Sequence, residues 1–507
     1  MDAAGMVSGL TPQVTARLEA LDRDRVLERI RAGDHTVWKD DPTEIANRLG
    51  WLTVVEPMRE RLGELESFAA EVAEEGVGTA VLLGMGGSSL APEVLMRTFG
   101  GSGIELVVLD TTHPATVQRV GAGLDVETTV FVVASKSGTT IETLSHLNHF
   151  WEIAPKGDRF VAITDPGTPL ESLAARRGFR ASFANPEDIG GRFSALSYFG
   201  LVPGALVGAP LAELLDAARR MADAPDVAAE NPGAVLGTLL GEAARRGRDK
   251  LTFVLPEPIA SFGDWAEQLL AESTGKEGLG IVPVVDEPLG PPEVYGDDRL
   301  FVAIGDVPEL DPLESAGHPV VRLPFERPED LGAEFFRWEL ATAVAGHILD
   351  INPFDQPNVQ EAKDATNQIL AGEAVAGAGF DDPAAVLDQV RPGDYVALLA
   401  YLDRTPETER SLERVRLAIR DRHRVATTVG FGPRFLHSTG QLHKGGPNTG
   451  VFVQLVDDTR SVDVPIPGRD LTFGTLIDAQ ALGDLRSLRT RGRRVARTTV
   501  DALAEVI

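Results

Sequence analysis

The chain has 507 residues, which is enough for about three domains of ordinary size. It carries 48 basic and 76 acidic residues, and the resulting net charge of −28 argues against nucleic acid or an anionic membrane as the main partner. There is no cysteine, which excludes disulfides, thiolate metal ligands and cysteine nucleophiles and is compatible with a cytoplasmic protein.

The first part of the chain, residues 1–76, reads as a helical segment. Apolar residues recur there at spacings of three and four, with acids and arginines between them, as in amphipathic surface helices. The first seven residues lack the basic and apolar regions of a signal peptide, and no stretch of the chain reaches ~18 uninterrupted apolar residues. We therefore expect a non-exported protein without membrane spans, and no catalytic residues in this segment.

Two apolar strands in the next unit, residues 77–220, each end in a loop rich in glycine, serine and threonine. The first strand, 80–83, runs into a loop that contains Gly87 and Ser88. The second, 130–134, runs into the loop 135–140, and strand–helix alternation predicts a parallel sheet whose carboxyl edge carries both loops. The second loop places four hydroxyls and one ammonium within six residues, namely Ser135, Lys136, Ser137, Thr139 and Thr140.

Such loops suit a phosphate group, because glycines allow close approach and free N–H groups at a helix start attract anions. For either loop alone, a helix cap with a glycine turn is the competing interpretation. Neither loop has the spacing of a dinucleotide or P-loop motif, so a small phosphorylated metabolite fits better.

Single candidate residues follow these loops along the chain. Arg192 comes directly after a glycine pair, where it could stabilise an oxyanion or bridge to a phosphate, or form only a structural salt bridge. In the second α/β unit, residues 221–390, Gln268 and Glu272 stand four apart and share a helix face. Two prolines bracket Gln356 in a loop that begins the helix carrying Lys363.

The last unit, residues 391–507, is predicted as an α/β unit that completes the second domain. It holds His437 and His443 in a glycine-rich loop, and histidine titrates near neutral pH, where proton transfer is most useful. The tail from Leu471 is predicted to be helical. Its six arginines between 486 and 497 favour a solvated or subunit-facing surface over a polyanion site.

Five of these motifs, in this order, resemble the signatures of the phosphoglucose isomerase family. They are 84–92, 135–143, 190–194, 268–276 and 352–357 together with Lys363, and they span roughly residues 80–365. The chain looks most similar to the isomerase half of transaldolase–isomerase fusions, although no transaldolase barrel is recognisable. The resemblance implies two doubly wound parallel-sheet sugar-isomerase (SIS) domains with helical N- and C-terminal extensions, and a site between the domains.

The implied activity is interconversion of glucose 6-phosphate and fructose 6-phosphate in the cytoplasm, without metal or cofactor. In the site that the resemblance implies, Glu272 moves a proton between C1 and C2, Arg192 stabilises the enediolate, and Gln356 contacts the substrate. Lys363 and a histidine assist ring opening. The resemblance and the chemistry of the two loops together assign the remaining contacts to the phosphate group and the sugar. These residues are Gly87, Ser88, Ser135, Lys136, Ser137, Thr139, Thr140 and Gln268.

The histidine is where the chain departs from the family pattern. In the family it lies between the glutamate and lysine motifs, whereas here the similar segment 440–448 comes after Lys363. We favour His443 for this role, with His437 as the alternative. In the family the histidine comes from a neighbouring subunit, which implies a homodimer. Two other functions stay open: a dual phosphoglucose/phosphomannose isomerase, and a sugar-phosphate-binding regulator without turnover.

Overall fold

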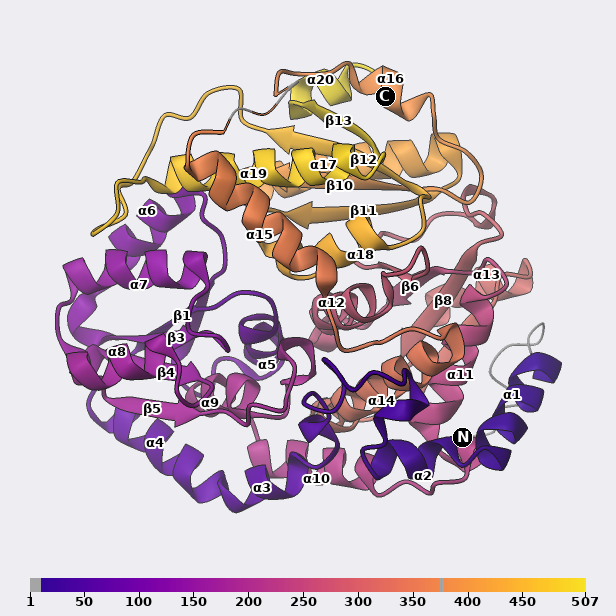
Figure 1. The fold of residues 1–507 in the computed structure, drawn as a ribbon, viewed down its shortest axis with the longest axis horizontal. Coiled ribbons are helices and arrows are strands. Elements are labelled where there is room, and N and C mark those ends of the chain that lie inside the picture. The colour runs from indigo at the N-terminus through magenta and orange to yellow at the C-terminus, as the bar shows by residue number, and fades with distance from the viewer. Residues whose placement is uncertain (1–10, 374, 376–377) are drawn as a thin grey trace.

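We describe a computed structural model that covers residues 11–373, 375 and 378–507. Residues 1–10, on which the expected lack of a targeting signal depends, lie outside the described residues. The described part contains three β-sheets in which all strand pairs are parallel, with helices packed around them (Figure 1). The predicted class, a doubly wound parallel α/β protein with a helical N-terminal extension, is confirmed.

The N-terminal segment, from residue 11 on, wraps around the base of the molecule as four α-helices (Figure 1). The first sheet follows with strand order β2-β1-β3-β4-β5. The helices and strands of these two parts are α1 (Thr11–Arg23), α2 (Val26–Arg31), α3 (Val55–Glu60), α4 (Leu62–Glu74), β1 (Thr79–Leu83), α5 (Leu90–Phe99), β2 (Glu105–Leu109), α6 (Pro114–Gly123), β3 (Thr129–Ala134), α7 (Ile141–Ile153), β4 (Phe160–Thr164), α8 (Pro169–Arg177), β5 (Ala181–Ala184) and α9 (Tyr198–Leu206).

The inner strands of this sheet form because their side chains are buried on both faces. All six residues of β3 are buried, and along β1 alternate residues enter two different hydrophobic cores. Leu83 at the end of β1 pairs in register with Val133 near the end of β3. The two glycine- and hydroxyl-rich loops therefore leave the sheet side by side.

The second sheet has the order β7-β6-β8-β9 and packs against long buried helices. Asn231 caps one of them, accepting hydrogen bonds from the backbone N–H groups of Gly233 and Ala234. The elements are α10 (Leu211–Ala222), α11 (Pro232–Ala244), β6 (Lys250–Val254), α12 (Phe262–Thr274), β7 (Val282–Val284), β8 (Arg299–Ile304), α13 (Asp311–Ser315), β9 (Val320–Leu323) and α14 (Leu331–Leu349).

The C-terminal strands form a sheet of their own, with order β11-β10-β12-β13. The sequence predicts that this unit completes the second domain, but its strands do not extend the second sheet, since no described strand of this unit pairs with β6–β9. Side chains make the junction instead: Arg416 donates to the carbonyl oxygens of Val285 and Asp286, just after β7. The elements are α15 (Pro357–Leu370), α16 (Pro383–Leu387), β10 (Tyr395–Tyr401), α17 (Pro406–His423), β11 (Ala426–Phe431), α18 (Gly440–Gly445), β12 (Gly450–Val456), α19 (Phe473–Thr490), β13 (Arg494–Thr498) and α20 (Val500–Ala504).

The three sheets share one strand order. In each, the first strand in sequence lies inside, the second flanks it on one side, and the third and fourth lie on the other. Ligands usually bind where such an order reverses, at the carboxyl edge. In the third sheet, side chains of the first α/β unit (residues 77–220) occupy the carboxyl edge at this point. His113 Nε2 lies 3.0 Å from Asp457 Oδ2, and Arg119 Nη1 lies 2.8 Å from Asp403 Oδ2.

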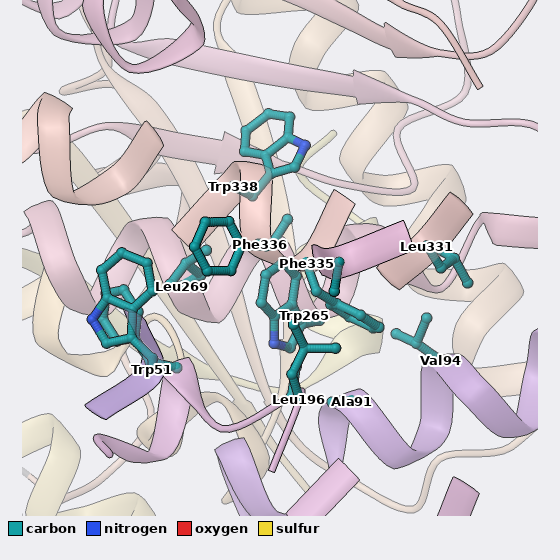
Figure 2. Close-up of a cluster of buried hydrophobic side chains, with 14 of the residues drawn as sticks. Trp51, Ala91, Val94, Leu196, Trp265, Leu269, Leu331, Phe335, Phe336 and Trp338 are labelled. Atoms are coloured by element: carbon teal, nitrogen blue, oxygen red, sulfur yellow. The ribbon is translucent and has the colours of Figure 1, made fainter. Parts of the chain in front are cut away.

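A continuous hydrophobic core joins the first and second units (Figure 2). Trp265 of α12 meets Phe335 of α14 edge to face, with ring centroids 4.8 Å apart. Trp51 from the N-terminal segment packs between Phe193 and Phe336. This packing fixes α12 against α5 and the turn Gly86–Ser88, so that one side of α12 faces the loop that follows β1.

Candidate active site

A cavity of about 890 Å³ opens at the carboxyl ends of β1 and β3. Its walls come from the first unit, from α12, from the start of α15 and from the third unit. Most of the residues proposed from sequence line it together: Gly87, Ser88, Lys136, Ser137, Thr140, Arg192, Gln268, Glu272, Gln356, Lys363 and His437.

Glycines allow the loops around the cavity to touch one another. Gly86 has φ +55°, and a Cβ atom there would lie 2.7 Å from both Gln268 Nε2 and the His437 carbonyl oxygen. A Cβ atom on Gly87 would lie 2.0 Å from the Gly191 carbonyl oxygen. The loop after β1, α12, the Arg192 loop and the His437 segment therefore meet with no room for a side chain at Gly86 or Gly87.

The hydroxyl loop after β3 is organised by its own side chains. The hydroxyls of Ser135 and Thr140 lie 2.9 Å apart, as do those of Ser137 and Thr139. Ser135 is buried behind the wall, and Thr139 lines a neighbouring cavity of about 360 Å³, so these two do not line the main cavity. Lys136 forms an ion pair with Asp165 and donates to the Glu187 carbonyl oxygen at 2.9 Å.

Glu272 lies on α12 with its side chain facing the cavity. It is 5% exposed, and its Oε2 lies 3.3 Å from Gln268 Nε2 and 3.6 Å from Arg192 Nη1. Burial raises the pKa of Glu272 above its usual range, and the charges of Arg192, His437 and Lys276 offset only part of that effect. A buried carboxylate with a raised pKa suits a general base that must also release its proton.

The guanidinium of Arg192 is fixed by four hydrogen-bond acceptors. Its Nε donates to Ser273 Oγ at 2.7 Å, and its Nη2 donates to the carbonyl oxygens of Pro353 and Asp355 at 2.7 and 3.0 Å. Its Nη1 reaches Gln356 Oε1 at 3.3 Å, on the side where Glu272 lies. The cation is thus held rigidly beside the carboxylate, as a preorganised electrostatic site requires.

Lys363 lines the cavity from α15, two turns after Gln356. Its side chain is exposed, and no hydrogen bond or ion pair of its ammonium is found among the described residues. A cation without such a partner at the mouth of the cavity is available to an anionic or oxygen-rich ligand.

His437 reaches the cavity from the third unit, at the end of a short 3-10 turn, Arg434–His437. Its Nε2 lies 3.0 Å from Glu142 Oε1, and that carboxylate also accepts a hydrogen bond from Gln480 Nε2 at 2.6 Å. Burial opposes the ionisation of Glu142, but the charge and hydrogen bond of His437 outweigh it and lower the pKa of Glu142. A buried carboxylate at this distance fixes the orientation of the imidazole ring.

His443, the favoured histidine of the sequence analysis, does not line this cavity. It is 3% exposed and lies among the rings of Tyr395, Phe435 and Phe452 in the core of the third unit. Burial, Lys444 and Arg493 depress its pKa well below the usual range. The structure therefore corrects the choice: His437 is the histidine at the site, because the turn before α18 faces the cavity and α18 itself packs inward.

Sequence reasoning missed Glu142 as a site residue. It lies within the hydroxyl-loop motif, one residue into α7, where a glutamate reads as an ordinary first-turn acid. An acid in the first turn of a helix is expected to be solvated, whereas Glu142 is only 4% exposed. This burial distinguishes it from an ordinary first-turn acid. Lys276 was likewise passed over: it is buried, donates to Asp355 at 2.6 Å, and its pKa is lowered to about 8 by burial and by Arg192.

Among the described residues, no helix combines the length and the apolar character that crossing a membrane requires. The described residues also contain no group of three or more histidine, aspartate or glutamate side chains that could hold a metal ion.

Comparison with known proteins places this site in context. The family model described as phosphoglucose isomerase matches residues 37–278. A glucose-6-phosphate isomerase of Thermus thermophilus is 30% identical over 386 residues, which cover 65% of this chain and 92% of that protein. A glucose-6-phosphate isomerase of Rubrobacter xylanophilus is 28% identical over 418 residues, which cover 70% and 95%.

Solved structures agree in fold. A hypothetical protein from Thermus thermophilus superposes with a TM-score of 0.62 at 28% identity, covering 72% of this chain and 99% of that one. The glucose-6-phosphate isomerase of Chlamydia trachomatis gives a TM-score of 0.59 at 21% identity, covering 74% and 87%. The superposition with the hypothetical protein covers almost all of that structure. More than a quarter of this chain has no counterpart in it.

Proposed function

The chain belongs to the phosphoglucose isomerase family and is an aldose–ketose isomerase, and from this premise we propose that it interconverts glucose 6-phosphate and fructose 6-phosphate through a cis-enediolate, with Glu272 as the base and without a metal ion. The observation that carries the proposal is the placement of Glu272, Arg192, His437 and the hydroxyl loop around one cavity. The proposed site acts in the cytoplasm on a free sugar phosphate.

The phosphate group binds at the edge of the first sheet. Ser88, Ser137 and Thr140 offer hydroxyls there, and the N-terminus of α7 adds its positive dipole end. Lys136 and Lys363 supply local positive charge in a molecule whose net charge is strongly negative. The sugar then extends from this edge toward α12.

His437 and Lys363 open the sugar ring. His437, whose ring is oriented by Glu142, can pass a proton to the ring oxygen while a base removes the proton of the anomeric hydroxyl, which gives the open-chain sugar. Lys363, whose ammonium has no hydrogen bond or ion pair within the described part of the chain, lies where it can stabilise charge on the sugar oxygens.

Glu272 then moves the proton between the two carbons. It removes the C2 proton of the aldose. The electron pair of that C–H bond forms a C1–C2 double bond, and negative charge develops on the C1 carbonyl oxygen. Arg192, held 3.6 Å from Glu272, stabilises that oxygen. Return of the proton to C1, with transfer of the hydroxyl proton between the two oxygens, completes the ketose.

A coupled assay with fructose 6-phosphate tests the proposal. Glu272→Gln is expected to lower turnover by about 100-fold or more, the scale of general-base catalysis, with little change in binding of a sugar-phosphate analogue. The matched control is Glu339→Gln on α14, a fully buried carboxyl outside the cavity whose pKa burial raises well above its usual range.

Three outcomes of this assay contradict parts of the proposal. Near-normal turnover in Glu272→Gln removes the base. Loss of activity with a chelator removes metal independence. Equal rates with mannose 6-phosphate replace the narrow substrate assignment by a dual one.

Two further features are proposed with this function. The units 1–76, 77–220, 221–390 and 391–507 are proposed as its domains, although α15 packs along α19 of the last unit (Figure 1). A homodimer is proposed as its assembly. The cavity lining described above includes the chain's own His437, so we propose that each chain uses its own histidine.

A further inference from the structure

His437 belongs to the third unit, whereas its proposed partners belong to the first and second units. The turn that carries it lies between β11 and α18 and is not part of a sheet. Something must keep this turn in register with Glu272 and the phosphate loops. Two side chains attach it, one at each end: Arg434, three residues before His437, and Gln441, four residues after it.

Arg434 fastens the start of the turn to three elements of the other two units. Its Nη1 donates to Glu93 Oε2 on α5 at 2.6 Å and to Asp110 Oδ2 after β2 at 2.9 Å. Its Nη2 donates to Asp264 Oδ2 on α12 at 3.2 Å. Asp110 also accepts from the Ser89 hydroxyl at 3.2 Å, which links this cluster to the phosphate loop.

Gln441 fastens the other end, and all its side-chain polar atoms are used. It is 0% exposed, and its Nε2 donates to the Gly275 carbonyl oxygen at 2.9 Å and to Asn358 Oδ1 at 2.7 Å. Its Oε1 accepts from the Asn358 backbone N–H at 2.9 Å. Gly275 ends the helix of Glu272, and Asn358 begins the helix of Lys363, so one amide joins both to the histidine segment.

Between these two anchors the turn is also held directly. The His437 carbonyl oxygen accepts a hydrogen bond from Gln268 Nε2 at 2.6 Å, one helical turn from Glu272. Neither anchor lines the main cavity, so neither touches the reacting atoms. We propose that Arg434 and Gln441 are positioning residues that hold His437 in register with Glu272 across the unit boundary. This inference rests on the proposed function.

The physical reason is the steep dependence of proton transfer on geometry. A displacement of about 1 Å in a catalytic group costs on the order of 100-fold in rate. If the anchors serve His437, their loss affects ring opening more than the later proton transfer. An analogue of fructose 6-phosphate without the C5 hydroxyl lacks the oxygen that closes the ring. It therefore needs only the proton transfer between C1 and C2.

The test compares kcat/KM for fructose 6-phosphate and for this open-chain analogue in Arg434→Lys, Arg434→Met and Gln441→Leu. We expect kcat/KM to fall about 10-fold to 100-fold with fructose 6-phosphate and several-fold less with the analogue. His437→Asn should show the same difference between the two substrates. Matched controls are Arg494→Met, which breaks an ion pair with Asp394, and Gln454→Leu, a buried amide bonded to Ala481 and Arg497. Both controls lie in the third unit away from the turn and should retain wild-type ratios.

Arg434→Met removes the cation that three largely buried carboxylates share, so Arg434→Lys and Gln441→Leu carry the test if that variant does not fold. Equal losses with both substrates, or ratios like those of the controls, overturn the inference and leave the proposed function intact. A wild-type protein that does not turn over fructose 6-phosphate overturns the proposed function, and the inference with it.

Discussion

The balance of forces on Glu272 decides what the site can do. Burial favours the protonated acid, while Arg192 at 3.6 Å favours the carboxylate. The first effect is the larger one, so the side chain holds a proton at a higher pH than an exposed glutamate does. A base that gives its proton back in the next step benefits from this compromise.

A pH profile checks this balance. The base works only when Glu272 is ionised, so kcat/KM should fall as the pH drops through its raised pKa, above the ordinary glutamate value of 4.5. Arg192→Gln removes the main charge that opposes protonation, so the acid limb should move to higher pH in addition to the loss of rate. An unchanged or lower limb in that variant contradicts the electrostatic assignment, and Arg494→Gln serves as the control.

At this scale the sequence predicts residue types well and their surroundings poorly. Glu272, Arg192, Gln356 and Lys363 fall in local motifs, and all four line the cavity. The choice between His437 and His443 depends on which way a short turn faces, and six residues of spacing carry no information on that. The role of Glu142 is equally hidden, because only its tertiary burial separates it from a helix-start acid.

Helix packing in the second unit depends on a stripe of small residues. Gly233, Gly237 and Gly241 recur at every fourth position of α11 and face α14. A Cβ atom on Gly237 would lie 2.4 Å from the Ala341 carbonyl oxygen and 2.8 Å from Val344 Cβ. The two helices can approach closely only because this stripe carries no side chains.

Gly237→Ala should therefore destabilise the protein. The new Cβ atom would lie 2.4 Å from a backbone oxygen, so the cost of separating the helices is expected at the upper end of about 1–3 kcal/mol, above the gain of about 1 kcal/mol from better helix propensity. The measurement is the apparent Tm, with activity per folded molecule unchanged. Gly121→Ala in α6, where the new atom would make only ordinary contacts of 3.7–4.0 Å, is the matched control and should not lower the Tm.

Strand and helix prediction succeeds where the pattern is long or apolar and fails at the sheet edges. The inner strands β1, β3, β6 and β10 stand out as buried apolar runs. The strand β13 does not: the tail expected to be helical contains α19 and then this strand, whose arginines pair with Asp394 and Gln454. Pairing with β12 creates that strand, and local propensity does not reveal it.

On the scale of the whole molecule, residues from three sheet-bearing units line one cavity. The family resemblance implies a histidine from a neighbouring subunit, yet the histidine at this cavity is the chain's own His437. Whether the histidine acts in the chain that carries it is a question about the assembly, and an experiment on mixed assemblies answers it.

Subunit complementation tests this arrangement. Chains carrying Glu272→Gln and chains carrying His437→Asn are co-expressed and purified together. If each site is built within one chain, every mixed assembly contains only defective sites, and its activity should equal the average of the two variants. Activity well above that average would mean that the histidine of one chain serves the site of the other. A mixture of wild type and Glu272→Gln calibrates the measurement.

The occupied crevice of the third sheet limits how this protein can be re-engineered. Asp403 and Asp457 stand where a ligand would otherwise bind, and Thr116, Arg119 and His113 of the first unit hold them there. Cutting the chain before β10 would expose these carboxylates and remove the ion-pair partners of His113 and Arg119, so the part that begins at β10 is not a detachable module. Loop grafting between residues 432 and 446, with the sheet left in place, is the route by which the ring-handling chemistry could be exchanged.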